Sequence, residues 1–189
     1  MVYAKDLLNE AIERVRAIIE EKNPNLSNKQ EIASQVGVGA VIFHDLFNLR
    51  IKNVSFSWEQ VLNFEGATGP YIQYTYARAN SILKKQEDIN WNLGVENMEY
   101  YKKESIKNLL KLLVNYESII VEAASRKEPC VIARYAYSLA QSFNQFYQEC
   151  NIQAAKAGWK EAWLQITDLT QKTIQDAMAL LGIECPKQM

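Results

Sequence analysis

Apolar residues recur at intervals of three and four along most of this sequence, which is the periodicity of amphipathic α-helices. The first such stripe predicts a helix over residues 6–22. A second helix is predicted over residues 29–48, where Ser27 and Gln30 have the spacing of an N-terminal capping box. Two glycines inside this second helix indicate either close packing against another helix or a break in it.

The same periodicity predicts the remaining helices. Ser57 and Gln60 form a second candidate capping box, which begins a short helix. Longer helices are expected over residues 70–85, 104–115, 116–126, 129–150 and 159–181. Gly182 has the position of a helix-ending glycine. The polar residues 86–94 interrupt the pattern and are predicted to form a long surface loop. The sequence therefore predicts an all-α protein.

The stretch from Gly66 to Arg78 combines a predicted turn with a predicted helix that carries two tyrosines and an arginine. Its glycines and threonine predict a tight turn, and Pro70 is expected at the first position of the helix, where proline is favoured. Tyr71, Tyr74 and Arg78 lie three and seven positions apart and so share one helical face. Such a face, beside a helix N-terminus, suits unstacked bases and phosphate groups. The alternative is that both tyrosines cover the core and keep their hydroxyls in water.

Composition agrees with a helical protein and limits its partners. The chain has 189 residues, of which 48% are hydrophobic, so it is long enough to bury a core. Its seven glycines and four prolines are few, which favours helices over loops. The formal net charge of −1 argues against a non-specific polyanion binder, and no binding to DNA is expected. A local site for a few unpaired bases is compatible with that charge.

The three cysteines indicate reduced thiols. Cys130, Cys150 and Cys185 are far apart and form no C-x-x-C pair, which argues against a disulfide framework or a metal site. No apolar run has the length of a membrane span, and the first six residues do not begin a signal peptide. A cytoplasmic protein without membrane contact is expected.

Catalytic motifs are absent from the sequence. His44 is the only histidine, so neither a Ser–His–acid triad nor an H-E-x-x-H zinc site can be assembled. The segment Gly37-Val38-Gly39 is too short for a G-x-G-x-x-G phosphate loop, and no strand is predicted before it. The residues alone therefore predict a binding module with no catalytic residues.

Several motifs, in order along the chain, resemble the arginyl-tRNA synthetases. They are Gln35–Ala40, Asp45-Leu46, Phe64–Tyr74, Glu128-Pro129, Leu139-Ala140, Phe143-Asn144, Phe146-Tyr147, Leu180–Ile183 and Met189. The similarity covers essentially the whole chain. It implies an all-α helical bundle of the DALR anticodon-binding type, preceded by connecting helices that join it to a class I catalytic domain. Residues 1–65 would be the connecting segment and residues 66–189 the anticodon-binding bundle.

The resemblance also implies a partner, the tRNA for arginine, contacted at its anticodon loop. The tRNA-binding residues that match the family are Gly66, Thr68, Gly69, Tyr71, Tyr74, Arg78, Tyr147 and Met189. In this interpretation the glycines and threonine shape the loop that precedes the binding helix. The tyrosines, the arginine and the methionine face the anticodon bases.

The resemblance further implies a division of labour. Neither the H-I-G-H-like segment nor the K-M-S-K-like loop of class I synthetases is found in the sequence. ATP and arginine would therefore bind to a catalytic domain supplied in cis or as a separate chain, and this chain would need no cofactor. The complete enzyme would make arginyl-tRNA from arginine, ATP and tRNA.

Two positions depart from the family pattern. Ser57 replaces a common acid before a tryptophan, and Trp163 replaces a common arginine in the last helix. The loss of a basic residue favours an alternative in which the chain is a stand-alone helical module for protein interaction or regulation, without RNA binding. Trp159 and Trp163 themselves are expected in the core or at its edge.

Overall fold

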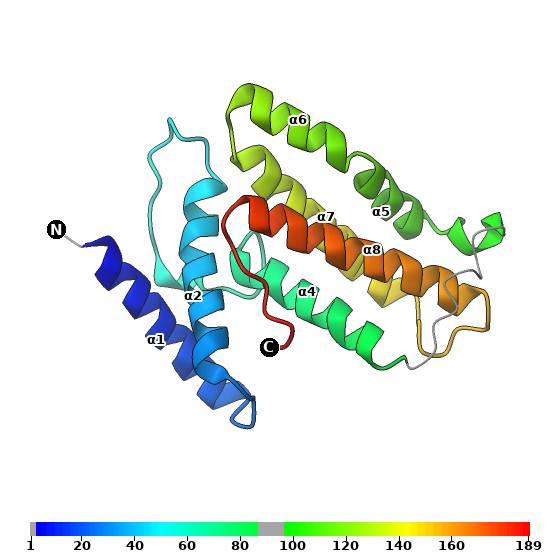
Figure 1. Cartoon of the computed structure of the whole chain (residues 1–189), viewed down its shortest axis with the longest axis horizontal. Coiled ribbons are helices and arrows are strands. Elements are labelled where there is room, and N and C mark those ends of the chain that lie inside the picture. Colours follow the sequence, from blue (N-terminus) through cyan, green and yellow to red (C-terminus); the bar gives the residue numbers. More distant parts are fainter. Residues whose placement is uncertain (1–2, 87–96) are drawn as a thin grey trace.

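A computed structural model describes residues 3–86 and 97–189, and all regular structure within them is helical. The elements are α1 (Ala4–Lys22), α2 (Lys29–Leu46), α3 (Trp58–Val61), α4 (Gly69–Lys84), the 3₁₀-helix η1 (Met98–Tyr101), α5 (Glu104–Val114), α6 (Tyr116–Arg126), α7 (Cys130–Glu149) and α8 (Trp159–Leu180) (Figure 1). The predicted all-α class is confirmed, and each predicted helix is present within two residues of its expected ends. Most of the predicted loop at 86–94 lies outside the described residues.

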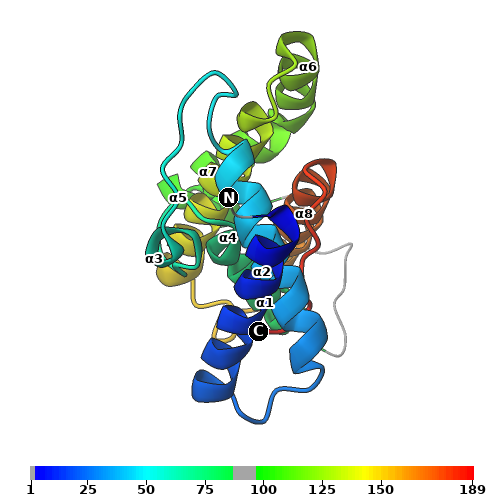
Figure 2. The ribbon, with the colours of Figure 1, turned by 90° about the vertical axis from the view of Figure 1, so that its left-hand side faces the viewer.

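The helices form a two-helix hairpin beside a larger bundle. Helices α1 and α2 lie against each other, and α4, α5, α7 and α8 pack together with α6 at the outer edge (Figure 1). Seen from the hairpin side, α1, α2 and the short α3 stand in front of the bundle (Figure 2). Helix α2 belongs to both parts, because Val36 is buried in the hairpin core and Phe43 in the bundle core.

The two glycines of α2 are sites of close helix packing. A Cβ atom on Gly37 would lie 2.8 Å from the backbone nitrogen of Ile12 in α1. A Cβ atom on Gly69, at the start of α4, would lie 2.9 Å from the carbonyl oxygen of Gly39. Helix α2 runs unbroken through both positions. Of the two interpretations left open by the sequence, close packing is therefore correct.

Both predicted capping boxes are wrong. Asn28, in the left-handed conformation at φ 57°, occupies the N-cap of α2 and makes no side-chain capping bond. The Ser27 hydroxyl instead accepts a 2.7 Å hydrogen bond from Gln188 near the C-terminus. Ser57 is the N-cap of α3 but also makes no side-chain capping bond. The first prediction is thus displaced by one residue from the true N-cap, and the second has the right N-cap residue without the capping bond.

Helix α4 has a side-chain cap. The Thr68 hydroxyl accepts a 3.3 Å hydrogen bond from the backbone N–H of Tyr71 and donates one of 2.6 Å to the Asn63 carbonyl. Pro70 is the second helical residue, because α4 begins at Gly69, one residue earlier than expected. Thr68 thus ties the preceding turn to the helix that carries the candidate binding residues.

The chain after α8 returns across the bundle toward the hairpin. Gly182, at φ 73°, ends the helix as predicted. The fully buried Gln73 of α4 donates hydrogen bonds to the carbonyl oxygens of Gln35 in α2, at 3.0 Å, and Glu184 in the tail, at 2.7 Å. Further along, Met189 packs against the hairpin core. The tail therefore connects the two parts of the molecule and brings the C-terminus next to α1 and α2.

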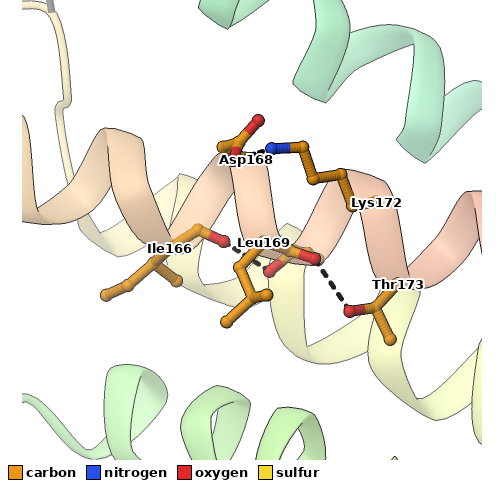
Figure 3. A network of polar contacts seen from close by, with 6 residues as sticks. Ile166, Asp168, Leu169, Lys172 and Thr173 are labelled. Carbon is orange, nitrogen blue, oxygen red and sulfur yellow. Dashed lines mark hydrogen bonds and ion pairs between the residues drawn. The ribbon is translucent and has the colours of Figure 1, made fainter. Parts of the chain in front are cut away.

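Helix α8 buries threonines without leaving their hydroxyls unpaired. Thr170 donates a 2.7 Å hydrogen bond to the Ile166 carbonyl, and Thr173 donates one of 2.8 Å to the Leu169 carbonyl (Figure 3). Each hydroxyl is satisfied one turn back along its own helix, so the threonine can face the core without desolvation cost from an unmet polar group. Lys172 on the same helix forms an ion pair with the Asp168 carboxylate.

The expected core position of Trp163 is confirmed. Its side chain is 7% exposed, and its indole N–H donates a 3.2 Å hydrogen bond to the Tyr100 carbonyl. Trp159, half-buried, contacts it with ring centroids 5.5 Å apart. The departure from the family pattern at residue 163 therefore affects packing of the core, and an arginine there would bury a charge. Within the described residues, no helix is long and apolar enough to cross a membrane.

The packing of α1 on α2 predicts that Gly37→Ala destabilises the protein, whereas helix propensity alone predicts that it stabilises it. Gly37→Ala should lower the free energy of unfolding by about 1–3 kcal/mol, because the added methyl group meets backbone atoms that cannot rotate away. Propensity alone would raise stability by about 1 kcal/mol for the same change inside a helix. Urea unfolding followed by circular dichroism measures the difference. A more stable variant would show that the helix contact at Gly37 can adjust without cost.

Candidate nucleic-acid interface

A cavity of about 690 Å³ lies where the hairpin meets the bundle. One wall is mostly apolar and comes from α1 and α2, together with Phe64 of the loop before α4 and Met189 of the tail. Lys22, at the end of α1, and Asn23 add polar groups to this wall. The opposite wall comes from α4 and α7 and carries aromatic and polar groups. Of the eight residues predicted to bind tRNA, Tyr71, Tyr74, Arg78 and Met189 line this cavity.

The guanidinium of Arg78 lies over two exposed aromatic rings. Its central carbon lies 4.8 Å from the ring centroid of Tyr74 and 5.4 Å from that of Tyr147. The two tyrosines are 41% and 40% exposed. Tyr147 itself lines a smaller adjacent cavity, which shares Gln148 with the larger one. The fold therefore brings Tyr147 of α7 next to the α4 face.

The positive charge of Arg78 is not neutralised locally. Its Nη1 atom donates a 2.6 Å hydrogen bond to the neutral side-chain oxygen of Asn144. Within residues 3–86 and 97–189, no carboxylate forms an ion pair with it. Glu65 is the acidic residue that lines the cavity. A cation flanked by exposed aromatic faces suits a ligand that combines flat rings with negative charge.

Tyr71 and Tyr74 differ in their surroundings. Tyr71 is half-buried, its hydroxyl accepts a 2.9 Å hydrogen bond from Asn144, and its ring contacts Tyr137 with centroids 5.7 Å apart. Tyr74 extends from the next turn of α4 and keeps much of its ring in solvent. The packing interpretation therefore describes Tyr71 well, whereas Tyr74 presents a free face. Both still line the cavity.

The three loop residues are placed to shape the site and are not among its lining residues. Gly66 is exposed and has φ 88°, a backbone conformation that favours glycine. Gly69 is buried against α2, and Thr68 caps α4. The neighbouring Phe64 and Glu65 do line the cavity. The turn thus determines where α4 begins and how these two side chains enter the site.

Sequence reasoning missed two polar residues of the α7 wall, Asn144 and Gln148. A signal was available, because Asn144 belongs to a segment that resembles the family. It also lies three residues before Tyr147 and so shares its helical face. An amide on the helical face of a candidate binding residue could therefore have been predicted as part of the site.

Other chemistry-bearing residues lie apart from the cavity. His44 lies 3.2 Å from the Ser55 carbonyl oxygen and contacts the ring of Phe56. The cysteines form no disulfide, and burial raises the pKa of the Cys185 thiol to about 12. In the described part of the chain, no cluster of three or more histidine, cysteine or acidic residues could hold a metal ion.

Residues 72–189 match the family described as the DALR anticodon binding domain, and residues 1–58 match the catalytic domain of class I tRNA synthetases (R). The arginine–tRNA ligase of Alkaliphilus metalliredigens is 40% identical over 190 residues, covering 100% of this chain and 33% of that protein. The Thermus thermophilus arginyl-tRNA synthetase structure is 34% identical with a TM-score of 0.91, covering 100% and 32%. The Plasmodium falciparum arginyl-tRNA synthetase, at 24% identity and a TM-score of 0.83, shares the fold. This chain thus spans about a third of the curated relatives.

The different burial of the two tyrosines predicts different effects on stability. Tyr71→Ala should lower the free energy of unfolding by about 2–4 kcal/mol, because it removes a packed ring and a hydrogen bond. Tyr74→Ala should cost less than about 1 kcal/mol. Tyr71→Phe isolates the hydroxyl and should cost about 0.5–1.5 kcal/mol. Urea titrations measure all three, and equal losses for both alanine variants would contradict this assignment.

Proposed function

We propose, because this chain belongs to the family of DALR anticodon binding domains, that it binds the anticodon loop of the tRNA for arginine. Its resemblance to the arginyl-tRNA synthetases is confirmed by relatives that are about 40% identical over the whole chain. Because the chain spans a third of those relatives, the activity of a complete enzyme is part of the proposal. That enzyme would join arginine to its tRNA with release of AMP and pyrophosphate, in the cytoplasm.

The two family matches divide the chain close to the predicted domain boundary. Residues 1–58, which include the hairpin, match the catalytic-domain family, and residues 72–189 match the anticodon-binding family. The boundary predicted at residues 65 and 66 falls between these matches and stays a prediction. ATP and arginine would bind in a catalytic domain, joined in cis or present as a separate chain.

The cavity between the hairpin and the bundle is the observation that carries the proposal. Anticodon bases lie in a single-stranded loop, so they can be unstacked and placed on protein surfaces. Tyr74 and Tyr147 offer exposed ring faces, and Arg78 between them offers an unneutralised cation for a base edge or a phosphate. The apolar wall with Met189 would exclude water from the other side of a bound base. The turn from Gly66 to Gly69 would shape the entrance.

Titration of the chain with tRNA tests the proposal directly. The tRNA for arginine should bind more tightly than other tRNAs, and its affinity should fall as salt rises from about 50 to 200 mM, because phosphate contacts release counterions. The chain alone should show no arginine-dependent ATP–pyrophosphate exchange. A gel-shift or filter-binding assay and an exchange assay measure these outcomes. Absence of binding at low salt would favour the helical interaction module, and robust exchange would overturn the division of labour.

Replacement of the exposed residues should separate binding from folding. Tyr74→Ala and Arg78→Ala should each weaken tRNA binding about tenfold, since loss of a stacking contact costs roughly 1–3 kcal/mol per base. Arg134→Ala is a matched control, because Arg134 also lies over an aromatic ring, that of Phe47, but does not line the cavity. Tyr3→Ala is the matched tyrosine control, at an exposed position of the N-terminal segment. Equal losses in the control variants would contradict the assignment of the site.

A further inference from the structure

Asn144 of α7 connects its helix to three positions of α4. Its side-chain oxygen accepts a 2.6 Å hydrogen bond from Nη1 of Arg78. Its amide nitrogen donates 2.9 Å hydrogen bonds to the Tyr71 hydroxyl and to the Thr75 hydroxyl. The residue is 8% exposed. Asn144 thus contacts three residues that lie on one face of α4, over two successive turns.

The orientation of this amide follows from its partners. The guanidinium of Arg78 can only donate hydrogen bonds, so the oxygen of Asn144 must face it. The Thr75 hydroxyl donates its own proton to the Tyr71 carbonyl, at 2.9 Å, and therefore accepts from the amide nitrogen. Both N–H groups and the oxygen of Asn144 are then used in a single arrangement. A mostly buried amide with all its groups paired is held rigidly.

This arrangement fixes a side chain that would otherwise be mobile. A free arginine side chain samples many rotamers, and ordering it costs conformational entropy. The guanidinium of Arg78 lies over the rings of Tyr74 and Tyr147, and its Nη1 atom is bonded to Asn144. An aspartate could accept the same hydrogen bond, but it would also cancel the charge. The neutral amide leaves that charge available.

We propose that Asn144 is a positioning residue, which holds the Arg78 guanidinium between Tyr74 and Tyr147 and preserves its charge for the RNA. The role in RNA binding rests on the function proposed above, whereas the hold on Arg78 is a property of the free protein. Two independent measurements therefore test the two parts.

The hold on Arg78 is tested without RNA by ¹H–¹⁵N NMR of arginine-labelled protein, with the Arg78 signal assigned from its loss in Arg78→Lys. The Nε–H signal of the Arg78 guanidinium should be shifted upfield by the two tyrosine rings, and this proton should exchange slowly with water. In Asn144→Ala this signal should move toward the position of a free arginine and exchange faster. Gln145→Ala, the next residue, whose side chain bonds the exposed Glu149, should leave it unchanged. An unchanged signal in Asn144→Ala would overturn the hold.

The role in binding is tested by a double-mutant cycle with the tRNA for arginine. Asn144→Ala should weaken binding about three- to tenfold, the size expected for loss of a hydrogen bond to a charged group. In an Arg78→Ala background the same change should cost less than about twofold, because its effect passes through the arginine. Equal factors in both backgrounds would mean that Asn144 acts only on general stability. That result would overturn the positioning role.

Asn144→Asp separates charge from geometry. This variant keeps the shape of the side chain and the bond from Arg78. It replaces the amide N–H groups by an oxygen, to which the hydroxyls of Tyr71 and Thr75 can donate in turn, so the protein should still fold. Binding should weaken, and the slope of log affinity against log salt should fall by about 0.7, the value of one lost contact to a single strand. An unchanged slope would overturn the claim about charge. If the unmodified chain itself fails to bind tRNA, the proposed function fails, and the NMR measurement still decides the hold.

Discussion

The close contact between α2 and α4 is the constraint on which the site depends. At this crossing Gly69 lies directly against the backbone of Gly39, where a methyl group would not fit. Because α2 also packs on α1, the position of α4 against α2 sets the distance between the hairpin and the binding face. The cavity between them is thus a consequence of a helix crossing made close by glycines. The segment Gly37-Val38-Gly39, which resembles part of a phosphate loop in sequence, serves this packing.

Two buried amides extend from α4 and its neighbours and hold the walls of the cavity in place. Gln73 links α4 to α2 and to the C-terminal tail, and Asn144 links α7 to α4. Gln73 carries a cost, because its side-chain oxygen has no hydrogen-bond partner among the described residues. The bonds from its nitrogen bring the tail across the molecule and so place Met189 in the cavity. A fully apolar contact at Gln73 would avoid this cost, but it would not fix the position of the C-terminal tail.

The helices could be predicted from the sequence because an apolar stripe is a local pattern, repeated every turn. The caps could not, because the exact first residue of a helix and the partner of a serine depend on the rest of the fold. The N-cap of α2 is Asn28, and Ser27 instead accepts a hydrogen bond from the distant Gln188. The face of Tyr74 and Arg78 followed from helical spacing and the family resemblance. The cavity has no local signal, since its walls combine α1, near one end of the sequence, with Met189 at the other. The difference between Tyr71 and Tyr74 likewise required the position of α7.

The charge of the molecule determines what kind of recognition the site can support. With a formal net charge of −1, the chain as a whole has little long-range attraction for a polyanion. The proposed RNA binding would then arise from contacts inside the site, where Arg78 is unneutralised and two tyrosine faces are exposed. Stacking is indifferent to base identity, whereas a cation fixed in one position favours particular arrangements of base edge and phosphate. Under the proposed function, rigid placement of Arg78 would be the feature through which a nearly neutral helical bundle recognises one RNA loop among many.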